Sequence, residues 1–298
     1  MSEPNTEQVR YDVPVDKVAR ITLCRGSARN AQGMQMTYEL NAAFDRAAHD
    51  DSIKVIIVGA EGPHFSAGHD LSGDQGKTWR DFPIVGTWAD FDAGGAEGRY
   101  GREKEIYLEL AERWRNIPKP TIAAVQGKCI SGGLILAWVC ELIVSTEDVQ
   151  FCDTTVDLGL PGAEFFMHPY ELGTRKAKEW LFTTGWIGAR EAEARGMVNR
   201  VVAREALETE VLSLARLIAA KPSFALKLVK DTCNYAQDLA GRRQTAQHSF
   251  GLHHLAHAHN QVKYGVHADP GGMPPALREK FRKRMGLNDD PDNSGQST

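Results

Sequence analysis

Apolar residues along this chain follow two kinds of pattern: short continuous runs, and longer segments with helical spacing. The continuous runs predict strands buried on both faces, and they cover Val18–Leu23, Ile53–Val58, Thr121–Val125, Leu142–Ser145 and Val149–Cys152. The segments with apolar residues three or four positions apart predict helices, over Gln35–His49, Glu103–Asn116, Gly132–Cys140, Arg175–Thr183, Ala189–Arg195, Ala206–Ala220 and Ser223–Leu239. Strands and helices that alternate in this way indicate an α/β protein.

The helical pattern dominates the second half of the chain, which suggests a division into parts. We predict an α/β core over residues 10–203, a helical region over residues 204–288 and a flexible polar tail over residues 289–298. Within the core, Ser72–Arg102 is rich in glycine and charge, which is typical of a long surface loop. Its aromatic residues are expected either to line a ligand pocket or to anchor the loop to the core; they include Trp79, Phe82 and Trp88.

Composition and charge exclude several classes of function. The formal net charge is -4 and no basic face with interleaved aromatic residues occurs, so we expect no nucleic-acid partner. No run of about 18 apolar residues occurs, so we expect no membrane span, and the polar N-terminus lacks the pattern of a secretory signal. The five cysteines are scattered without a C-x-x-C pair, which favours a reducing compartment and a cytoplasmic location.

Two glycine-rich segments, Gly59–Leu71 and Gly127–Gly133, each follow a predicted strand and carry the candidate chemistry. Ser131 is expected to cap the apolar helix, so that the amides of Gly132 and Gly133 lie in its first turn without helical partners. Such amides stabilise an oxygen that becomes negative during a reaction, and a second amide from the first segment would complete an oxyanion hole. Glycines after strands also serve simply as turns. Neither a dinucleotide-binding fingerprint nor a Walker motif occurs, which disfavours a nucleotide-binding oxidoreductase.

Five motifs, in order along the chain, resemble those of the enoyl-CoA hydratase/isomerase (crotonase) superfamily. They are Arg29–Ala31, Phe65–Leu71, Pro118–Gly127, Ser131–Gly133 and Gly185–Val202. The resemblance implies an α/β fold with a crotonase-like ββα spiral core and a C-terminal helical oligomerisation region. In this family that region builds a homotrimer, often paired into a hexamer. The resemblance also implies an enzyme of fatty-acid or related acyl-CoA metabolism, which takes an acyl-CoA thioester and forms its enolate.

The same resemblance assigns residues to the site. It implies that the backbone N–H groups of His69 and Gly132 hold the thioester oxygen, with the His69 side chain either exposed or in contact with the acyl group. Coenzyme A is part of the substrate, so no separate cofactor is expected. The residues that the resemblance assigns to substrate binding are Arg29, Ser66, Ala67, Gly68, Asp70, Leu71 and Gly133.

The acid–base residues depart from the hydratase pattern. The positions at which the family's hydratases carry two glutamates hold Ile135 and Thr155, and neither transfers a proton at neutral pH. Glu164 is the candidate base, because burial beside aromatic residues would raise its pKa; alternatively, its carboxylate only stabilises a helix N-terminus. His168 lies four residues later, on the same face if the segment is helical, and is a candidate partner or acid. Asp153 is expected to be structural.

Several activities stay open at this point. Hydration, double-bond migration, decarboxylation and thioester hydrolysis all use the same fold and oxyanion hole, so the family does not choose among them. The missing glutamates raise a further alternative, a CoA-thioester-binding protein without catalysis.

A run of histidines near the C-terminus raises the question of a metal. His253 and His257 have i, i+4 spacing, but no glutamate of the H-E-x-x-H type accompanies them. We therefore predict no metal site, and expect a helix face packed against a neighbouring subunit or the CoA tail. The run consists of His248, His253, His254, His257 and His259.

Overall fold

A six-stranded sheet forms the centre of the protein in a computed structural model that describes residues 7–71, 77–273, 275–276 and 278–279. The predicted tail over residues 289–298 lies outside the described residues. The strand order is β1-β2-β3-β4-β6-β9, in which β1 is antiparallel to β2 and the other neighbours are parallel. The strands are β1 (Val9–Val15), β2 (Val18–Leu23), β3 (Val55–Ala60), β4 (Thr121–Val125), β6 (Leu142–Thr146) and β9 (Arg200–Val202).

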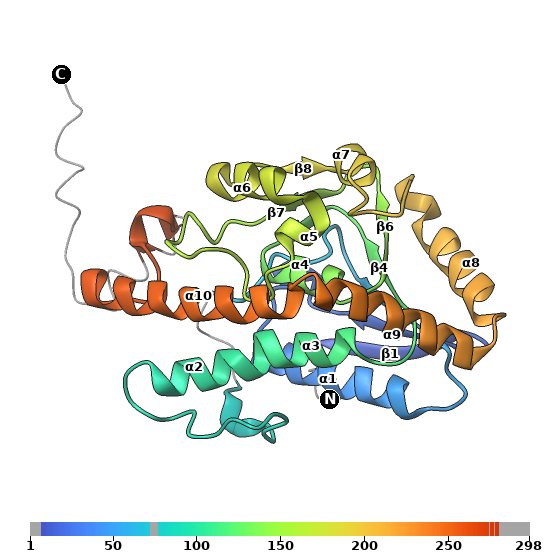
Figure 1. The fold of residues 1–298 in the computed structure, drawn as a ribbon, viewed down its shortest axis with the longest axis horizontal. Helices are drawn as coiled ribbons and strands as arrows, with labels where there is room; N and C mark the ends of the chain where they lie inside the picture. Colours follow the sequence, from blue (N-terminus) through green and yellow to red (C-terminus); the bar gives the residue numbers. More distant parts are fainter. Residues whose placement is uncertain (1–6, 72–76, 274, 277, 280–298) are drawn as a thin grey trace, which may run out of the picture.

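A smaller sheet and a set of helices complete the α/β fold (Figure 1). The small sheet has the order β5-β7-β8, and its strands are β5 (Lys128–Ile130), β7 (Gln150–Cys152) and β8 (Ile187–Gly188). The helices of the first half are α1 (Met34–His49), α2 (Glu97–Glu103), α3 (Leu110–Arg115) and α4 (Gly132–Trp138). Those of the second half are α5 (His168–Leu172), α6 (Thr174–Thr183), α7 (Ala189–Ala194), α8 (Leu207–Ala219), α9 (Ser223–Leu239) and α10 (Arg242–Tyr264). Among the described residues, no helix has the length and apolar character needed to cross a bilayer.

The predicted loop Ser72–Arg102 is shorter in the structure than expected, because its last part is helical. Residues 72–76 are outside the described part, Trp79–Asp81 form a 3₁₀ turn, and α2 begins at Glu97. A π-helical segment, Lys104–Glu109, then joins α2 to α3. The helix was not predicted from the sequence because it contains glycines, which are weak helix formers. Packing requires glycine at position 98, since a Cβ at Gly98 would lie 2.6 Å from the Phe91 carbonyl oxygen.

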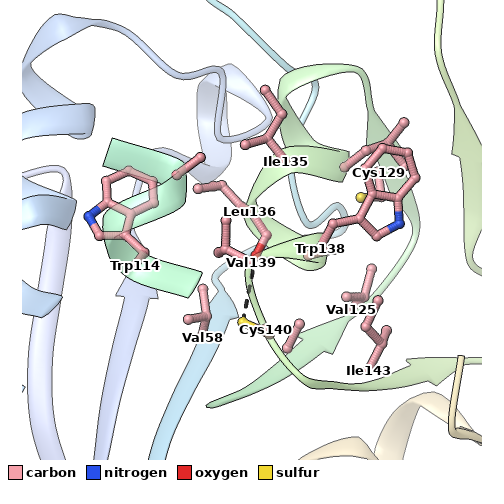
Figure 2. Packing of buried hydrophobic residues seen from close by; sticks show 14 of the residues in the cluster. Val58, Trp114, Val125, Cys129, Ile135, Leu136, Trp138, Val139, Cys140 and Ile143 are labelled. Carbon is pink, nitrogen blue, oxygen red and sulfur yellow. Dashed lines mark hydrogen bonds between the residues drawn. The ribbon is translucent and has the colours of Figure 1, made fainter. Parts of the chain in front are cut away.

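Both faces of the central sheet are buried, which explains the continuous apolar runs. One face packs on α1, α3 and α4, and Figure 2 shows Trp114 of α3 and residues of α4 above strand residues such as Val58 and Val125. The other face packs on α8 through Val211, Leu214, Ala215 and Ala219. Although α8 belongs to the region after residue 204, it therefore covers the sheet and is not a separate appendage.

Helix α10 is held at its start by a buried arginine. Figure 1 shows α10 lying alongside the continuous helical stretch that α2 and α3 form. Arg242 is fully buried and donates to both carboxylate oxygens of Glu112 on α3, at 2.5 and 2.9 Å, and to Asp238 of α9 at 2.6 Å. A guanidinium is suited to this task because its planar donors match carboxylates bidentately.

Removing this arginine should cost a large part of the stability. We expect Arg242→Ala to lower the free energy of unfolding by about 3 kcal/mol, because it leaves the Glu112 carboxylate without its partner. Urea unfolding followed by circular dichroism measures the change. The matched control is Arg243→Ala, whose side chain is exposed and whose effect should stay within about 0.5 kcal/mol. Equal effects of the two substitutions would contradict the role given to Arg242.

Candidate active site

The two glycine-rich segments lie side by side. Ser66 and Cys129 form a parallel bridge, and the Ile130 amide donates to the Ser66 carbonyl at 3.0 Å. The same register, counted three residues onward from Ser66 and from Cys129, places His69 beside Gly132. The contact is close, since a Cβ at Gly68 would lie 3.3 Å from the Gly132 amide nitrogen and 2.8 Å from the Ile130 carbonyl oxygen. Gly68 also has φ +87, which disfavours a side chain.

The two amides assigned to the oxyanion hole are free of partners. Among the described residues, neither the His69 N–H nor the Gly132 N–H donates a hydrogen bond. Ser131, which precedes Gly132, has φ 44 and ψ −103, a strained backbone of the kind that clusters at functional sites. The side chain of Ser131 does not cap α4, contrary to our expectation, and bonds instead to Asp153 at 3.2 Å.

Ser66 and Gly133 shape the turn. The Ser66 side chain is fully buried, donates to the Asn30 carbonyl at 2.8 Å and accepts from Gln32 and from the Gly68 amide. The hydroxyl is therefore occupied within the protein, and any contact of Ser66 with substrate would come from its backbone. A Cβ at Gly133 would lie 2.9 Å from the Ser66 carbonyl oxygen, so Gly133 allows the segments to pack closely.

A cavity of about 350 Å³ opens beside the paired segments. Three of the residues predicted to bind substrate line it: Ala67, Asp70 and Leu71. Asp70 pairs with Arg25 at 3.0 Å, and Leu71 is 54% exposed. Arg29 is exposed and does not line this cavity. The further lining residues are Arg99, Glu103, Tyr107, Ser131, Thr154, Thr155, Leu158, Leu160, His253, His257, His267, Ala268 and Met273, together with His69 and Glu164.

A second hollow, of about 480 Å³, lies between α9 and β6 and is lined by residues such as Glu141 and Lys230. None of its lining residues comes from the glycine-rich segments. The smaller cavity is therefore the candidate active site, because it combines open amides with titratable groups.

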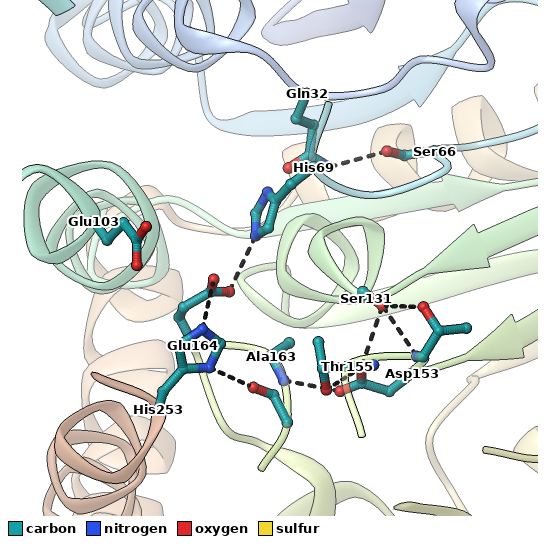
Figure 3. Close-up of polar contacts among 12 residues, drawn as sticks. Gln32, Ser66, His69, Glu103, Ser131, Asp153, Thr155, Ala163, Glu164 and His253 are labelled. Carbon is teal, nitrogen blue, oxygen red and sulfur yellow. Dashed lines mark hydrogen bonds and ion pairs between the residues drawn. The ribbon is translucent and has the colours of Figure 1, made fainter. Parts of the chain in front are cut away.

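The partly buried His69 pairs with the buried Glu164 at the edge of the cavity (Figure 3). The His69 Nε2 atom lies 3.0 Å from Glu164 Oε2, and the His69 ring stacks on Tyr107 with 3.8 Å between ring centroids. Burial lowers the pKa of His69, but the charge and hydrogen bond of Glu164 raise it to a net value above its ordinary one. Burial raises the pKa of Glu164, but the charges of His69 and His253 bring it below its ordinary value, so the raised pKa expected from the sequence is corrected. The net directions favour an ionised carboxylate beside an imidazolium.

His168 lies outside the cavity, which corrects its assignment as a catalytic partner of Glu164. The segment between the two residues is not helical, and α5 begins only at His168. Gly162 has φ +151 and a Cβ there would lie 2.6 Å from the Phe166 ring, so the chain turns tightly before Glu164. His168 is fully buried and its Nε2 atom lies 2.8 Å from Asp153 Oδ2.

Asp153 is the centre of a buried hydrogen-bond network that connects the parts of the site. It accepts from the Thr155 amide and hydroxyl, from the Ser131 hydroxyl and from the Ala163 amide, as Figure 3 shows. Ser131 precedes Gly132 and Ala163 precedes Glu164. Asp153 therefore has a structural role, as expected, and through its hydrogen bonds it positions both halves of the site.

The positions at which hydratases carry glutamates are filled by groups without proton-transfer ability. Ile135 is 3% exposed and packs in the apolar core. Thr155 lines the cavity but donates its hydroxyl to Asp153 at 2.7 Å.

Among the cavity residues that sequence analysis did not assign to the site are Tyr107, Glu103 and His253. The i, i+4 spacing of His253 and His257 on α10 indicated one shared face, but the partner of that face was not evident. The structure shows that His253 and His257 on this face line the cavity. The predicted aromatic walls of the loop instead anchor it: Phe82 stacks on Tyr38, Trp88 packs on Tyr100, and Trp79 contacts Phe91.

Paired glycine segments beside a buried carboxylate, on an α/β core of this topology, define a crotonase-type protein. The profile of the family "Enoyl-CoA hydratase/isomerase" matches residues 15–82 and 87–269. The chain therefore belongs to the enoyl-CoA hydratase/isomerase family, and the recognition of this family from its motifs is confirmed.

Individual relatives agree with this assignment. EchA13 of Mycobacterium tuberculosis is 43% identical over 302 residues, which cover 93% of this chain and 92% of that protein. A 4-chlorobenzoyl coenzyme A dehalogenase from Arthrobacter is 32% identical over 72% of this chain and 74% of its own. The crystal structure of a probable enoyl-CoA hydratase from Mycobacterium smegmatis superposes with a TM-score of 0.79 at 42% identity, covering 88% of this chain and 99% of that one.

Proposed function

We propose that the protein binds an acyl-CoA thioester, holds its carbonyl oxygen with the His69 and Gly132 amides, and uses Glu164 to move a proton on the acyl group. The observation that carries the proposal is the position of the Glu164 carboxylate, 3.0 Å from the His69 ring and in the cavity that also contains Ala67 and Ser131. An enolate oxygen placed against two open amides is stabilised, and losing one such donor typically costs about 3–4 kcal/mol of barrier.

Among the reactions open to the family, double-bond migration is the one that this site supports best. It removes a proton from the carbon next to the thioester, leaves a dienolate, and returns a proton two carbons further along, so one carboxylate can serve both steps. Hydration in the family uses two glutamates, and their positions hold Ile135 and Thr155. The reaction needs no cofactor beyond the coenzyme A of the substrate, and it fits fatty-acid or related acyl-CoA metabolism.

The test is an assay with 3-hexenoyl-CoA in D₂O. We expect conjugation of the double bond, seen as new near-ultraviolet absorbance, together with deuterium in the product by mass spectrometry. Crotonyl-CoA in the same buffer tests hydration by loss of conjugated absorbance. Binding of both thioesters by calorimetry, without turnover or deuterium exchange, would contradict the proposal and leave a CoA-thioester-binding protein.

We also propose that the helices after residue 204 build a homotrimer in the cytoplasm. Support for assembly comes from apolar side chains that α9 leaves more than half exposed, which are Phe224, Val229, Tyr235 and Leu239. Support for a reducing compartment comes from the five cysteines, which are all free. Light scattering should give three times, or for paired trimers six times, the 32.9 kDa of one chain. A mass of one chain would contradict the assembly.

A further inference from the structure

Glu103, His253 and His257 bring three side-chain ligand atoms together at the wall of the cavity. One carboxylate oxygen of Glu103 and one ring nitrogen of each histidine all lie within 4.8 Å of one another. The histidines occupy one face of α10 by their i, i+4 spacing, and Glu103 ends α2 opposite them. Figure 3 shows Glu103, Glu164 and His253 around the same space.

Backbone carbonyls fix which nitrogen of each histidine faces that space. The Nδ1 atom of His253 lies 3.0 Å from the Gly162 carbonyl oxygen, and that of His257 lies 2.6 Å from the His267 carbonyl oxygen. A carbonyl can only accept a hydrogen bond, so Nδ1 carries the proton in both rings. In its neutral form each ring presents the lone pair of Nε2 to the cluster. Metal-binding histidines are oriented in this way by a hydrogen bond from their other nitrogen. Burial lowers the pKa of His257, but the hydrogen bond and charge of Glu103 raise it above its ordinary value, so a proton and a metal ion compete for that nitrogen.

The carboxylate is oriented in the same manner. Arg99 donates to Glu103 Oε1 at 2.9 Å, which leaves Oε2 directed at the histidines, 3.3 Å from His257 Nε2. Glu103 Oε2 and His253 Nε2 are both shielded from solvent, and among the described residues their partners lie at ion-pair distances: Glu103 Oε2 is 3.3 Å from the Nε2 atoms of His254 and His257, and His253 Nε2 is 3.6 Å from Glu164 Oε1. His253 itself is 1% exposed, so its Nε2 atom is buried without a hydrogen bond to the described part of the chain. A carboxylate oxygen among buried imidazole nitrogens is favourable only with a positive charge beside it, which either a proton on an imidazole or a bound cation supplies.

We propose that Glu103, His253 and His257 bind a divalent transition-metal ion at the wall of the cavity. Imidazole nitrogens with a carboxylate suit ions such as Zn²⁺, Fe²⁺ or Co²⁺ better than Mg²⁺ or Ca²⁺. Metal–ligand bonds of about 2.0–2.2 Å in a tetrahedral site place ligand atoms roughly 3.4 Å apart, close to the separation of Glu103 and His257. Since all three residues line the cavity, a fourth position faces the substrate space and would take a water or an acyl oxygen.

The Glu164 carboxylate adds to the negative charge around this position. Its Oε1 atom lies 3.6 Å from His253 Nε2, while its Oε2 atom bonds to His69. Two carboxylates therefore flank the ring of His253, which favours a cation there over an anionic or apolar ligand. The proposal does not depend on which reaction Glu164 carries out.

The experiment uses untagged full-length protein that has been treated with EDTA and then freed of chelator. Co²⁺ is titrated in and its visible d–d absorbance is followed. We expect one equivalent to bind saturably, with a Kd at or below the micromolar range, and Zn²⁺ to displace it. Absence of a saturable band, or binding only at millimolar Co²⁺, would overturn the proposal, and a shared proton would then join Glu103 to His257.

Variants locate the ion. His253→Ala, His257→Ala and the isosteric Glu103→Gln should each weaken Co²⁺ binding at least 10-fold, whereas His259→Ala, an exposed position on the same helix, should not. Thermal melting with and without Zn²⁺ is the second measurement, since the ion should raise the Tm of the wild type and of His259→Ala only. Unchanged Co²⁺ binding in Glu103→Gln and His257→Ala would show that the ion binds elsewhere, which would also refute the proposal.

Discussion

Glu164→Gln should lower kcat of the acyl-CoA reaction by about 10²–10⁴-fold, the usual contribution of a positioned proton-transfer group. The amide has the shape of the carboxylate and can still accept a hydrogen bond from His69, whose Nε2 atom lies 3.0 Å away. What it loses is the ability to take a proton from the carbon next to the thioester. Steady-state kinetics with 3-hexenoyl-CoA measures the change, and calorimetry should find substrate binding nearly unchanged.

Two comparisons make this result specific. Glu179→Gln removes a carboxylate that is exposed on α6, and it should leave kcat unaltered. Deuterium exchange into bound substrate should be lost in Glu164→Gln along with turnover, because both need the same base. If Glu164→Gln showed deuterium exchange and turnover at wild-type rates, Glu164 would not be the base.

Asp153→Ala should be the most destabilising single substitution near the site, by about 3–5 kcal/mol of unfolding free energy, because it leaves several buried hydrogen-bond donors without their acceptor. The aspartate is 1% exposed, and its removal leaves the His168 ring and the Ala163 amide without their hydrogen-bond acceptor. Urea unfolding provides the measurement. Asp157→Ala, at an exposed position four residues away, should change the unfolding free energy by at most about 0.5 kcal/mol.

The same aspartate should make the protein sensitive to acid. Burial raises the pKa of Asp153, but the hydrogen bond and charge of His168 and the amides of Ala163 and Thr155 together bring it well below its ordinary value. A folded-state pKa below the unfolded one gives stability that is present above the unfolded value, about 3.9, and is lost progressively as the pH falls from there towards the lower folded-state value. The Tm of the wild type should therefore fall more steeply between about pH 5 and 3 than that of Asp153→Asn. Parallel Tm curves for the two proteins would contradict this.

The consequences of Asp153 for catalysis are indirect. It touches the residues that precede Gly132 and Glu164, so it positions an oxyanion donor and the base without contacting the acyl group. We expect Asp153→Asn to lower kcat without changing which product forms, as steady-state kinetics and mass spectrometry of the product would show. This positioning role was not evident in the sequence, where Asp153 carried no motif.

The amino-acid sequence by itself determined the elements of the core and the place of the oxyanion segments. Continuous apolar runs predicted β2 and β4 with the bounds that the structure has, and α9 was also predicted over its full length. These patterns are local, because a strand buried on both faces and an amphipathic helix each need their apolar residues at fixed spacing. The motif around Gly68 is equally local, since its backbone conformation excludes a side chain.

Only the tertiary structure decided which side chains share the cavity. Glu164 pairs with His69, 95 positions away, and not with His168, because a tight turn at Gly162 replaces the expected helix. Glu103 faces His257 only because the π-helical segment and α10 pack along each other. Helical and strand periods fix neighbours within one element, whereas contacts between distant elements depend on how their apolar faces pack, which no local pattern encodes.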